Sequence, residues 1–256
     1  MIPNPIRKVL SSMRTNGVQA LLMGGQACVF YGAAEFSRDT DFAILAEPLN
    51  LARLRFALDE LQAKQIAVPP FEADFLRRGH AIHFRCAHPE AAGWHINVRA
   101  VMRGVDAFPL LWERRTTIES EGEEYDLLAL PDLVRAKKTQ RDKDWPMIRR
   151  LVEAHYFEFG DDASAEQITF WLKELRTPLL LREVATLHPE RVQQLQSERR
   201  VLDRLLQDAA DDVIENALHT EEQQERMADR AYWQPLKNEL ESLRRNVARQ
   251  NKGASE

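Results

Sequence analysis

Short apolar runs and longer amphipathic segments divide the chain into a mixed part and a helical part. Residues 18–23 and 40–46 are short apolar runs, and the first is bounded by turn residues, so we expect two buried strands. Between residues 51 and 64, leucines recur every three or four positions, which predicts an amphipathic helix packed on a sheet. Residues 66–101 contain three more short runs rich in β-branched and aromatic residues. The pattern predicts an α/β (α+β) fold with a small mixed β-sheet and flanking helices.

From residue 164 onward the pattern is helical. Ser164 and Gln167 have the spacing of a capping box before an apolar run. The polar stretch before them, which contains Gly160, is the best candidate for a domain boundary. We therefore expect a first domain at residues 1–157 and an all-helical C-terminal region at residues 164–250.

Two glycines and two acids frame the segment between the first two strands. Gly24 and Gly25 precede a short predicted helix, and the backbone N–H groups at a helix start can hold phosphate oxygens. Asp39 and Asp41 begin the second strand, where alternate side chains point to one face, roughly 6.5–7 Å apart. Taken singly, a Gly-Gly turn or a pair of solvated acids is common. Together they predict a site for Mg²⁺ (or Mn²⁺) that carries a nucleoside triphosphate.

Other nucleotide and metal motifs are absent from the sequence. The glycines do not have the G-x-G-x-x-G spacing of a dinucleotide-binding loop, and no Lys-Ser/Thr follows them as in a Walker A loop. His80, Cys86 and His88 would face one side of a strand and His83 the other. Because this spacing matches no tetrahedral zinc pattern, we do not predict a zinc site there.

Composition and charge place the chain among ordinary globular proteins. Its 256 residues carry a net charge of −5, which does not suggest non-specific binding to nucleic acid. Two cysteines, Cys28 and Cys86, cannot form a disulfide framework, which favours a reducing compartment. The sequence shows neither a signal-peptide core nor an apolar run long enough for a membrane span. We expect a cytoplasmic protein with no membrane partner.

The stretch GGQACVFYGAAEFSRDTDFAI resembles the nucleotidyltransferase superfamily of the polymerase-β type, in which Gly-Gly, a short helix and Asp-x-Asp follow in this order. The segment from INVRAV to RDKDWPMIRRL is similar to bacterial nucleotidyltransferase-like proteins of the AbiEii-toxin kind, and the resemblance covers residues 18–153. It implies metal ligands at Asp39 and Asp41. It also implies nucleotide contacts at Gly24, Gly25, Lys137 (or Lys138) and Lys143. Arg38, beside the acids, either contacts a phosphate or pairs with Asp39 or Asp41.

One position departs from the family pattern. The third carboxylate of the family, which activates the attacking hydroxyl, should fall at Asn97. An amide oxygen can ligate a cation, but it carries no charge and accepts no proton at neutral pH. Transfer then proceeds with two acids and metal-bound substrate, or another acid substitutes (Glu72, Asp74 or Asp106), or transfer is lost and nucleotide binding remains.

Three functions follow from these possibilities. The first is an enzyme that transfers a nucleotidyl group to a hydroxyl acceptor, with Asp39, Asp41 and Asn97 at its centre. The second is a catalytically degenerate nucleotide-binding component of a toxin–antitoxin or regulatory system. The third is a scaffold whose C-terminal helices bind a protein partner without nucleotide chemistry. The acceptor is open among protein side chains, RNA ends and small hydroxylated molecules.

Overall fold

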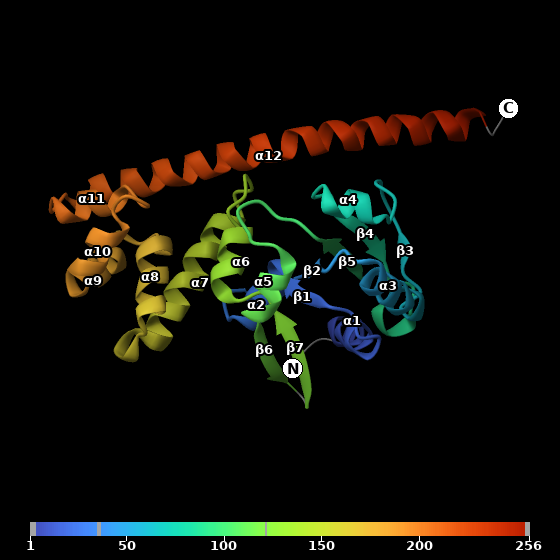
Figure 1. Cartoon of the computed structure of the whole chain (residues 1–256), viewed down its shortest axis with the longest axis horizontal. Coiled ribbons are helices and arrows are strands. Elements are labelled where there is room, and N and C mark those ends of the chain that lie inside the picture. The colour runs from blue at the N-terminus through green and yellow to red at the C-terminus, as the bar shows by residue number, and fades with distance from the viewer. Residues whose placement is uncertain (1–3, 35–36, 121, 254–256) are drawn as a thin grey trace. The chain divides into compact units, whose positions relative to one another are not determined.

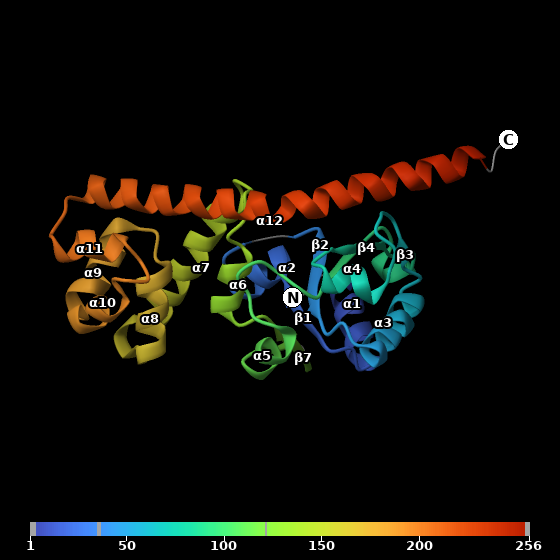
Figure 2. The same cartoon turned by 45° about the horizontal axis from the view of Figure 1, so that its top comes forward.

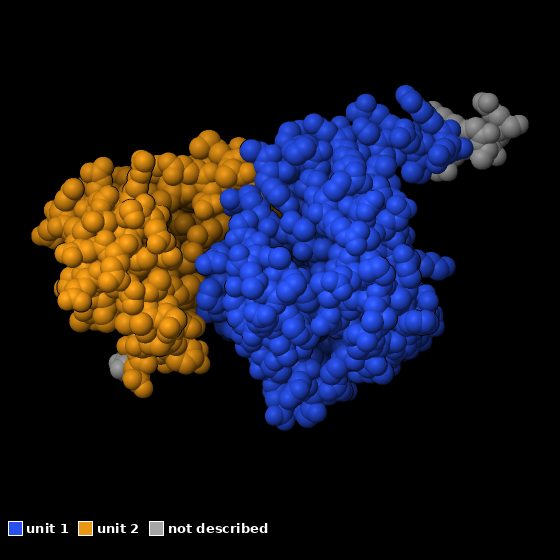
Figure 3. Space-filling view, viewed as in Figure 1, with its two compact units in different colours: residues 1–136, 231–256 blue, residues 137–230 orange. Residues whose placement is uncertain are grey.

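The computed structural model describes residues 4–34, 37–120 and 122–253 (Figures 1 and 2). The chain forms two compact units (Figure 3). The first unit comprises Met1–Ala136 together with Ala231–Glu256, and the second comprises Lys137–Arg230.

A seven-stranded mixed sheet forms the centre of the first unit, with the strand order β3-β4-β5-β2-β1-β7-β6. The pairs β2–β5 and β1–β7 are parallel, and all other neighbours in the sheet are antiparallel. The strands are β1 (Ala20–Met23), β2 (Asp39–Ile44), β3 (Lys64–Gln65), β4 (Ile82–Arg85), β5 (His95–Arg99), β6 (Thr116–Ser120) and β7 (Glu123–Leu127). The predicted α+β fold with a mixed sheet is confirmed.

Helices flank this sheet within the first unit. They are α1 (Asn4–Thr15), α2 (Gly24–Phe30), α3 (Pro48–Glu60), α4 (Ala73–Arg77), α5 (Phe108–Glu113) and α6 (Leu130–Ala136), with a 3₁₀ turn at Pro89–Ala91. The predicted amphipathic helix is α3, whose Leu51, Leu54 and Leu58 are buried while Phe56 is exposed. Proline is tolerated at its first position because that N–H has no partner within the helix.

The second unit is helical. It contains α7 (Asp144–Phe159), a 3₁₀ turn (Gly160–Asp162), α8 (Ala165–Glu174), α9 (Pro178–Leu187), α10 (Pro189–Leu195), α11 (Val201–Leu206) and the first part of α12 (Asp211–Gly253). The predicted capping box is present, since Ser164 and Gln167 exchange hydrogen bonds of 2.8 and 3.3 Å. In the part of the chain that the structure describes, no helix, α12 included, has both the length and the apolar character to cross a membrane.

The compact units do not begin and end where the predicted domains do. The second unit begins at Lys137 and ends at Arg230. Within it, Lys138 binds Glu174 of α8 at 2.9 Å. The later part of α12 belongs to the first unit. The domains expected at residues 1–157 and 164–250 stay a prediction.

The expected β-structure over residues 66–71 is wrong. The strand here is only the two-residue β3, and residues 66–71 lie outside the sheet. Pro69 and Pro70 have no N–H to donate to a neighbouring strand, so the apolar run cannot continue the ladder.

Candidate functional site

Asp39 and Asp41 lie on one face of β2. Along this strand Asp39 and Asp41 are half-buried, whereas Thr40 and Phe42 between and after them are buried. This alternation follows from the two-residue repeat of a strand. The predicted placement of both carboxylates on the same face is confirmed.

β5 places two polar side chains directly beside these acids. In the parallel register, His95 lies opposite Asp39 and Asn97 lies opposite Asp41. The Asn97 amide nitrogen donates to Asp41 Oδ1 at 2.9 Å, and His95 Nδ1 lies 3.2 Å from Asp39 Oδ1. The structure therefore brings together the three residues predicted for the centre of the site.

β4 extends both contacts by one more strand. His83 lies opposite Asn97, with 2.7 Å between His83 Nδ1 and Asn97 Oδ1. Arg85 lies opposite His95 and donates from Nε to His95 Nε2 at 3.1 Å. Two cross-strand rows result, which we name the Asp41 row (Asp41, Asn97, His83) and the Asp39 row (Asp39, His95, Arg85).

The donors in both rows point toward the carboxylates. Arg85 can only donate, so His95 Nε2 accepts and the ring proton is on Nδ1, facing Asp39. The carboxylate form of Asp41 only accepts, so the Asn97 amide nitrogen faces it and the amide oxygen faces His83. His83 then carries its proton on Nδ1. These proton positions are assigned from the hydrogen-bond network.

Sequence reasoning missed His83, Arg85 and His95 as members of the site. The sequence pattern gives no role to His95 or Arg85, and it raises His83 only as a metal ligand. The signal was nevertheless present, since polar residues alternate with apolar ones in both runs, at residues 83 and 85 and at residues 95 and 97. The missing information was the register that aligns these two strands with β2.

Gly24 lies against the Asp41 carboxylate. Its φ is +69°, in the left-handed region that favours glycine, and a Cβ atom there would lie 2.1 Å from Asp41 Oδ2. A Cβ atom on Gly25 would lie 2.8 Å from Ser37 Oγ. Gly24 therefore lets the start of the seven-residue helix α2 approach Asp41, and Gly25 lets it approach Ser37. Their contact with phosphate stays a prediction.

Arg38 is exposed and directly precedes Asp39 in the chain. Its guanidinium is thus a solvent-accessible positive charge next to Asp39 in the chain, and its contact with phosphate stays a prediction.

Lys137 and Lys143 belong to the second unit and have different surroundings. Lys137 is 5% exposed, and its ammonium lies 3.2 Å from Asp144 Oδ1. Asp144 Oδ2 accepts hydrogen bonds from Thr139 at 2.5 Å and from Arg141 at 2.7 Å. Lys143 is exposed and stands at the N-cap position of α7.

Charge rather than burial decides the protonation of Asp144. Burial alone raises the pKa of this carboxyl, but the charge of Lys137 and the contacts from Thr139 and Arg141 outweigh it, so its pKa lies below the ordinary value. From the sequence, Asp144 is expected to cap this helix because Trp145 and Pro146 follow it. That expectation is wrong, since Lys143 holds the N-cap position and Asp144 is the first residue of α7. Its carboxylate instead closes a buried ion pair.

The acids considered as substitutes for Asn97 have other surroundings. Asp106 accepts a hydrogen bond from Arg114 at 2.5 Å, which with the charge of Arg114 lowers its pKa below the ordinary value. Asp74 pairs with Arg77 at 3.5 Å, and Glu72 stands at the N-cap position of α4. None of these contacts is with the two rows.

The donor atoms at Asp39 and Asp41 fit Mg²⁺. Among the described residues, no group of three or more His, Cys, Asp and Glu side chains is arranged to hold a metal ion. Magnesium in nucleotide sites is commonly held by one or two carboxylates together with substrate phosphates and water. Two half-buried carboxylates on one strand face supply that smaller set of hard oxygen ligands.

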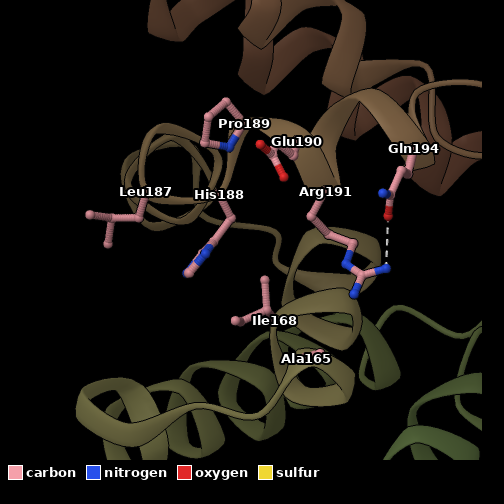
Figure 4. A pocket seen from close by; sticks show the side chains of 8 residues that line it. All are labelled: Ala165, Ile168, Leu187, His188, Pro189, Glu190, Arg191 and Gln194. Atoms are coloured by element: carbon pink, nitrogen blue, oxygen red, sulfur yellow. Dashed lines mark hydrogen bonds between the residues drawn. The ribbon is translucent and has the colours of Figure 1, made fainter.

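Two hollows are lined by residues outside both rows. One of about 460 Å³ in the second unit is bordered by α8, the end of α9 and α10 (Figure 4). There Arg191 donates to Gln194 at 2.8 Å, beside His188 and Ile168 (Figure 4). Another of about 280 Å³ in the first unit is lined in part by Phe42 and Trp112. Because Phe42 alternates with Asp41, this second hollow lies on the sheet face opposite the rows.

Comparison with known proteins gives little further information. No protein-family model matches the chain, and no curated protein is similar to it. Among solved structures, an antigenic nucleotidyltransferase-like protein from Paracoccidioides brasiliensis is similar at 16% identity, over 80% of this chain and 91% of that chain, with a TM-score of 0.39.

Proposed function

We propose that the first unit binds a nucleoside triphosphate with Mg²⁺ and transfers its nucleotidyl group to a hydroxyl acceptor. The observation that supports this proposal is the pair of half-buried carboxylates, Asp39 and Asp41, held by cross-strand donors beside the start of α2. The resemblance of the Gly-Gly and Asp-x-Asp motifs to nucleotidyltransferases supports the same function.

The residues of the first unit have distinct roles in this proposal. Asp39 and Asp41 hold the cation, which when bound supplies charge neutralisation for the triphosphate. Asn97 and His95 orient the two carboxylates through their hydrogen bonds. Gly24 leaves room for Asp41 beside the backbone of α2.

The reaction breaks a phosphoanhydride bond and forms a phosphate ester bond. The acceptor oxygen bonds to the α-phosphorus, the bond from that phosphorus to the bridging oxygen breaks, and pyrophosphate leaves with the electron pair. The proton of the acceptor hydroxyl passes to solvent water, since the Asn97 amide is not a base at neutral pH. No phosphate contact is assigned to Lys137, whose ammonium is taken up by Asp144.

The hydrogen bonds of Asn97 favour a second candidate function. Its amide donates to Asp41 and accepts from His83, so both of its polar atoms are engaged at the position where the family has a carboxylate. This arrangement also suits a protein that binds nucleotide without transferring it.

Calorimetry tests the binding step. Wild-type protein is titrated with non-hydrolysable analogues of the four nucleoside triphosphates, in Mg²⁺ and in EDTA. We expect binding that requires Mg²⁺ and is lost in Asp39→Asn and Asp41→Asn. Asp59→Asn is the matched control, since Asp59 is an exposed acid of α3 outside both rows. Absence of Mg²⁺-dependent binding by wild-type protein would contradict the proposal.

A transfer assay separates the two candidates. The protein is incubated with α-labelled triphosphate and Mg²⁺ or Mn²⁺, alone and with bulk RNA or a mixture of hydroxyl-containing peptides. Label transferred by wild-type protein but not by Asp41→Asn supports the enzyme. Transfer that appears only in Asn97→Asp supports binding without catalysis.

A further inference from the structure

The polar face of β5 continues beyond Asn97 to Arg99. Two residues along a strand are roughly 6.5–7 Å, and both side chains point to the same face. The Arg99 guanidinium carbon lies 4.9 Å from the centre of the Trp233 ring in α12, which is within the range of a cation–π contact. Both side chains are half-buried, and both belong to the first unit. We name them the Arg99–Trp233 pair.

The burial of β2 shows that this pair stands where the open part of the sheet face ends. Asp39 and Asp41 are half-buried, but Ala43, which lies opposite Arg99 in the register, is 1% exposed. The face is therefore accessible along the acids and covered at Ala43. The Arg99–Trp233 pair is positioned at the boundary between these two parts.

Neighbouring residues of α12 fix the position of Trp233. The Tyr232 hydroxyl oxygen lies 2.6 Å from the place of a Cβ atom on Gly79. Glu239 bonds Arg78 at 2.6 Å and His80 at 2.7 Å, so this part of α12 runs beside the end of α4 (Figures 1 and 2). A ring already held in place loses little conformational entropy when a ligand packs on it.

We propose that the Arg99–Trp233 pair is the base-binding wall of the nucleotide site. The nucleobase stacks on the accessible part of the Trp233 ring while the phosphates lie at Asp39 and Asp41, and the ribose spans the two-residue step from Asn97 to Arg99. Stacking on an aromatic side chain tolerates every base, because each base has a π face. This inference rests on the proposed nucleotide binding and adds the part of the ligand that lies beyond the phosphates.

The test compares a ligand that has a base with one that lacks it. Calorimetry measures the Kd of α,β-imido nucleoside triphosphate with Mg²⁺ and of inorganic tripolyphosphate with Mg²⁺. In Trp233→Leu, which keeps an apolar side chain but removes the π face, we expect nucleotide binding to weaken roughly 5- to 100-fold. Tripolyphosphate binding stays unchanged, and Trp233→Phe restores most of the nucleotide affinity.

Trp112 provides the matched control. It also contacts an arginine, with the Arg115 guanidinium carbon 4.3 Å from its ring centre, and it is half-buried. It lines the hollow with Phe42 on the opposite face of the sheet, so Trp112→Leu leaves both affinities unchanged.

A second measurement uses wild-type protein and needs no folded variant. An azido-base triphosphate is photo-crosslinked in Mg²⁺, and we expect the label on the peptide that contains Trp233. Label confined to other peptides overturns the inference. So does a Trp233→Leu variant whose affinities for nucleotide and tripolyphosphate fall equally, or do not fall at all. Wild-type protein that binds tripolyphosphate and nucleotide equally well also overturns it. If wild-type protein binds neither ligand, the proposed function itself fails.

Discussion

The Asp41 row of the first unit and the Lys137–Asp144 pair of the second unit use an aspartate in opposite ways. Asp41 is half-buried and receives a hydrogen bond from a neutral amide. Asp144 is 2% exposed and is opposed by the charges of Lys137 and Arg141. In the proposed function the first carboxylate serves as a cation ligand, whereas the charge of the second is neutralised inside the fold. Burial thus separates an acid proposed for binding, Asp41, from an acid and a lysine used for stability, Asp144 and Lys137.

Replacing Asp144 tests the stability side of this comparison and gives the largest expected effect. Asp144→Asn leaves the Lys137 ammonium buried without its counter-charge. Breaking a buried ion pair in this way costs about 3–5 kcal/mol of unfolding free energy. Urea denaturation measures the loss. Lys143→Ala, at an exposed position nearby, stays within about 0.5 kcal/mol of wild type. Similar losses of unfolding free energy in Asp144→Asn and Lys143→Ala would show that burial does not distinguish the roles of these two residues.

Gly24 tests the close approach of α2 to Asp41. Gly24→Ala puts a methyl group where Asp41 Oδ2 lies and imposes a left-handed φ on alanine. We expect a loss of about 2 kcal/mol in unfolding free energy, together with weaker Mn²⁺ binding measured by electron paramagnetic resonance. Gly25→Ala meets only the Ser37 hydroxyl, which can move aside, and costs less. Equal losses of unfolding free energy in Gly24→Ala and Gly25→Ala would contradict the close contact between Gly24 and Asp41.

His155 gives the second unit a pH dependence. Trp171 donates to His155 Nδ1 at 2.9 Å, and burial lowers the pKa of the ring below its ordinary 6.5, partly opposed by Glu158. The unfolded chain therefore binds this proton at a higher pH than the folded chain does. The free energy of unfolding falls as the pH falls below about 6.5, by up to about 1.4 kcal/mol per pH unit for one proton. Urea denaturation at several pH values measures this slope.

The control for this pH dependence is His155→Gln, which cannot titrate but retains an oxygen acceptor. We expect its unfolding free energy to depend less on pH in this window than that of wild type. Parallel pH profiles for the two proteins would assign the dependence to other groups.

Replacing His83 tests the role proposed for the Asp41 row in cation binding, and it has the smallest expected effect on stability. His83→Phe removes the donor that orients the Asn97 amide, at a cost of about 1 kcal/mol. Losing such an outer hydrogen bond weakens metal binding about 10-fold. His83→Gln supplies an amide donor and restores part of the affinity for Mn²⁺. An unchanged Mn²⁺ affinity in His83→Phe would show that the hydrogen bonds of the Asp41 row do not contribute to cation binding.

The fold and the two carboxylates were accessible from the sequence because each depends on a short-range pattern. The two-residue repeat placed Asp39 and Asp41 on one face, and the leucine spacing located α3. Neither pattern reports which strands become neighbours. The contacts of His83 and His95 depend on the register of β4, β5 and β2, which is set by packing across the whole sheet.

The surroundings of Lys137 could not be predicted for a related reason. In the sequence it stands in a run of basic and acidic residues that resembles a solvated helix surface. Its burial depends on how the residues that follow α6 fold back onto Asp144 and Trp145. A lysine and its counter-ion seven positions away look the same in sequence whether they lie in water or in a core.

The assignment of α12 to both units has a consequence for synthesis on the ribosome. All seven strands come from residues before 137, so the sheet can pair while the later residues are still being translated. Trp233 and Glu239 emerge only after the entire second unit has been made. The contacts of α12 with Gly79, His80 and Arg99 therefore form only after that stage, and so would the proposed base-binding wall.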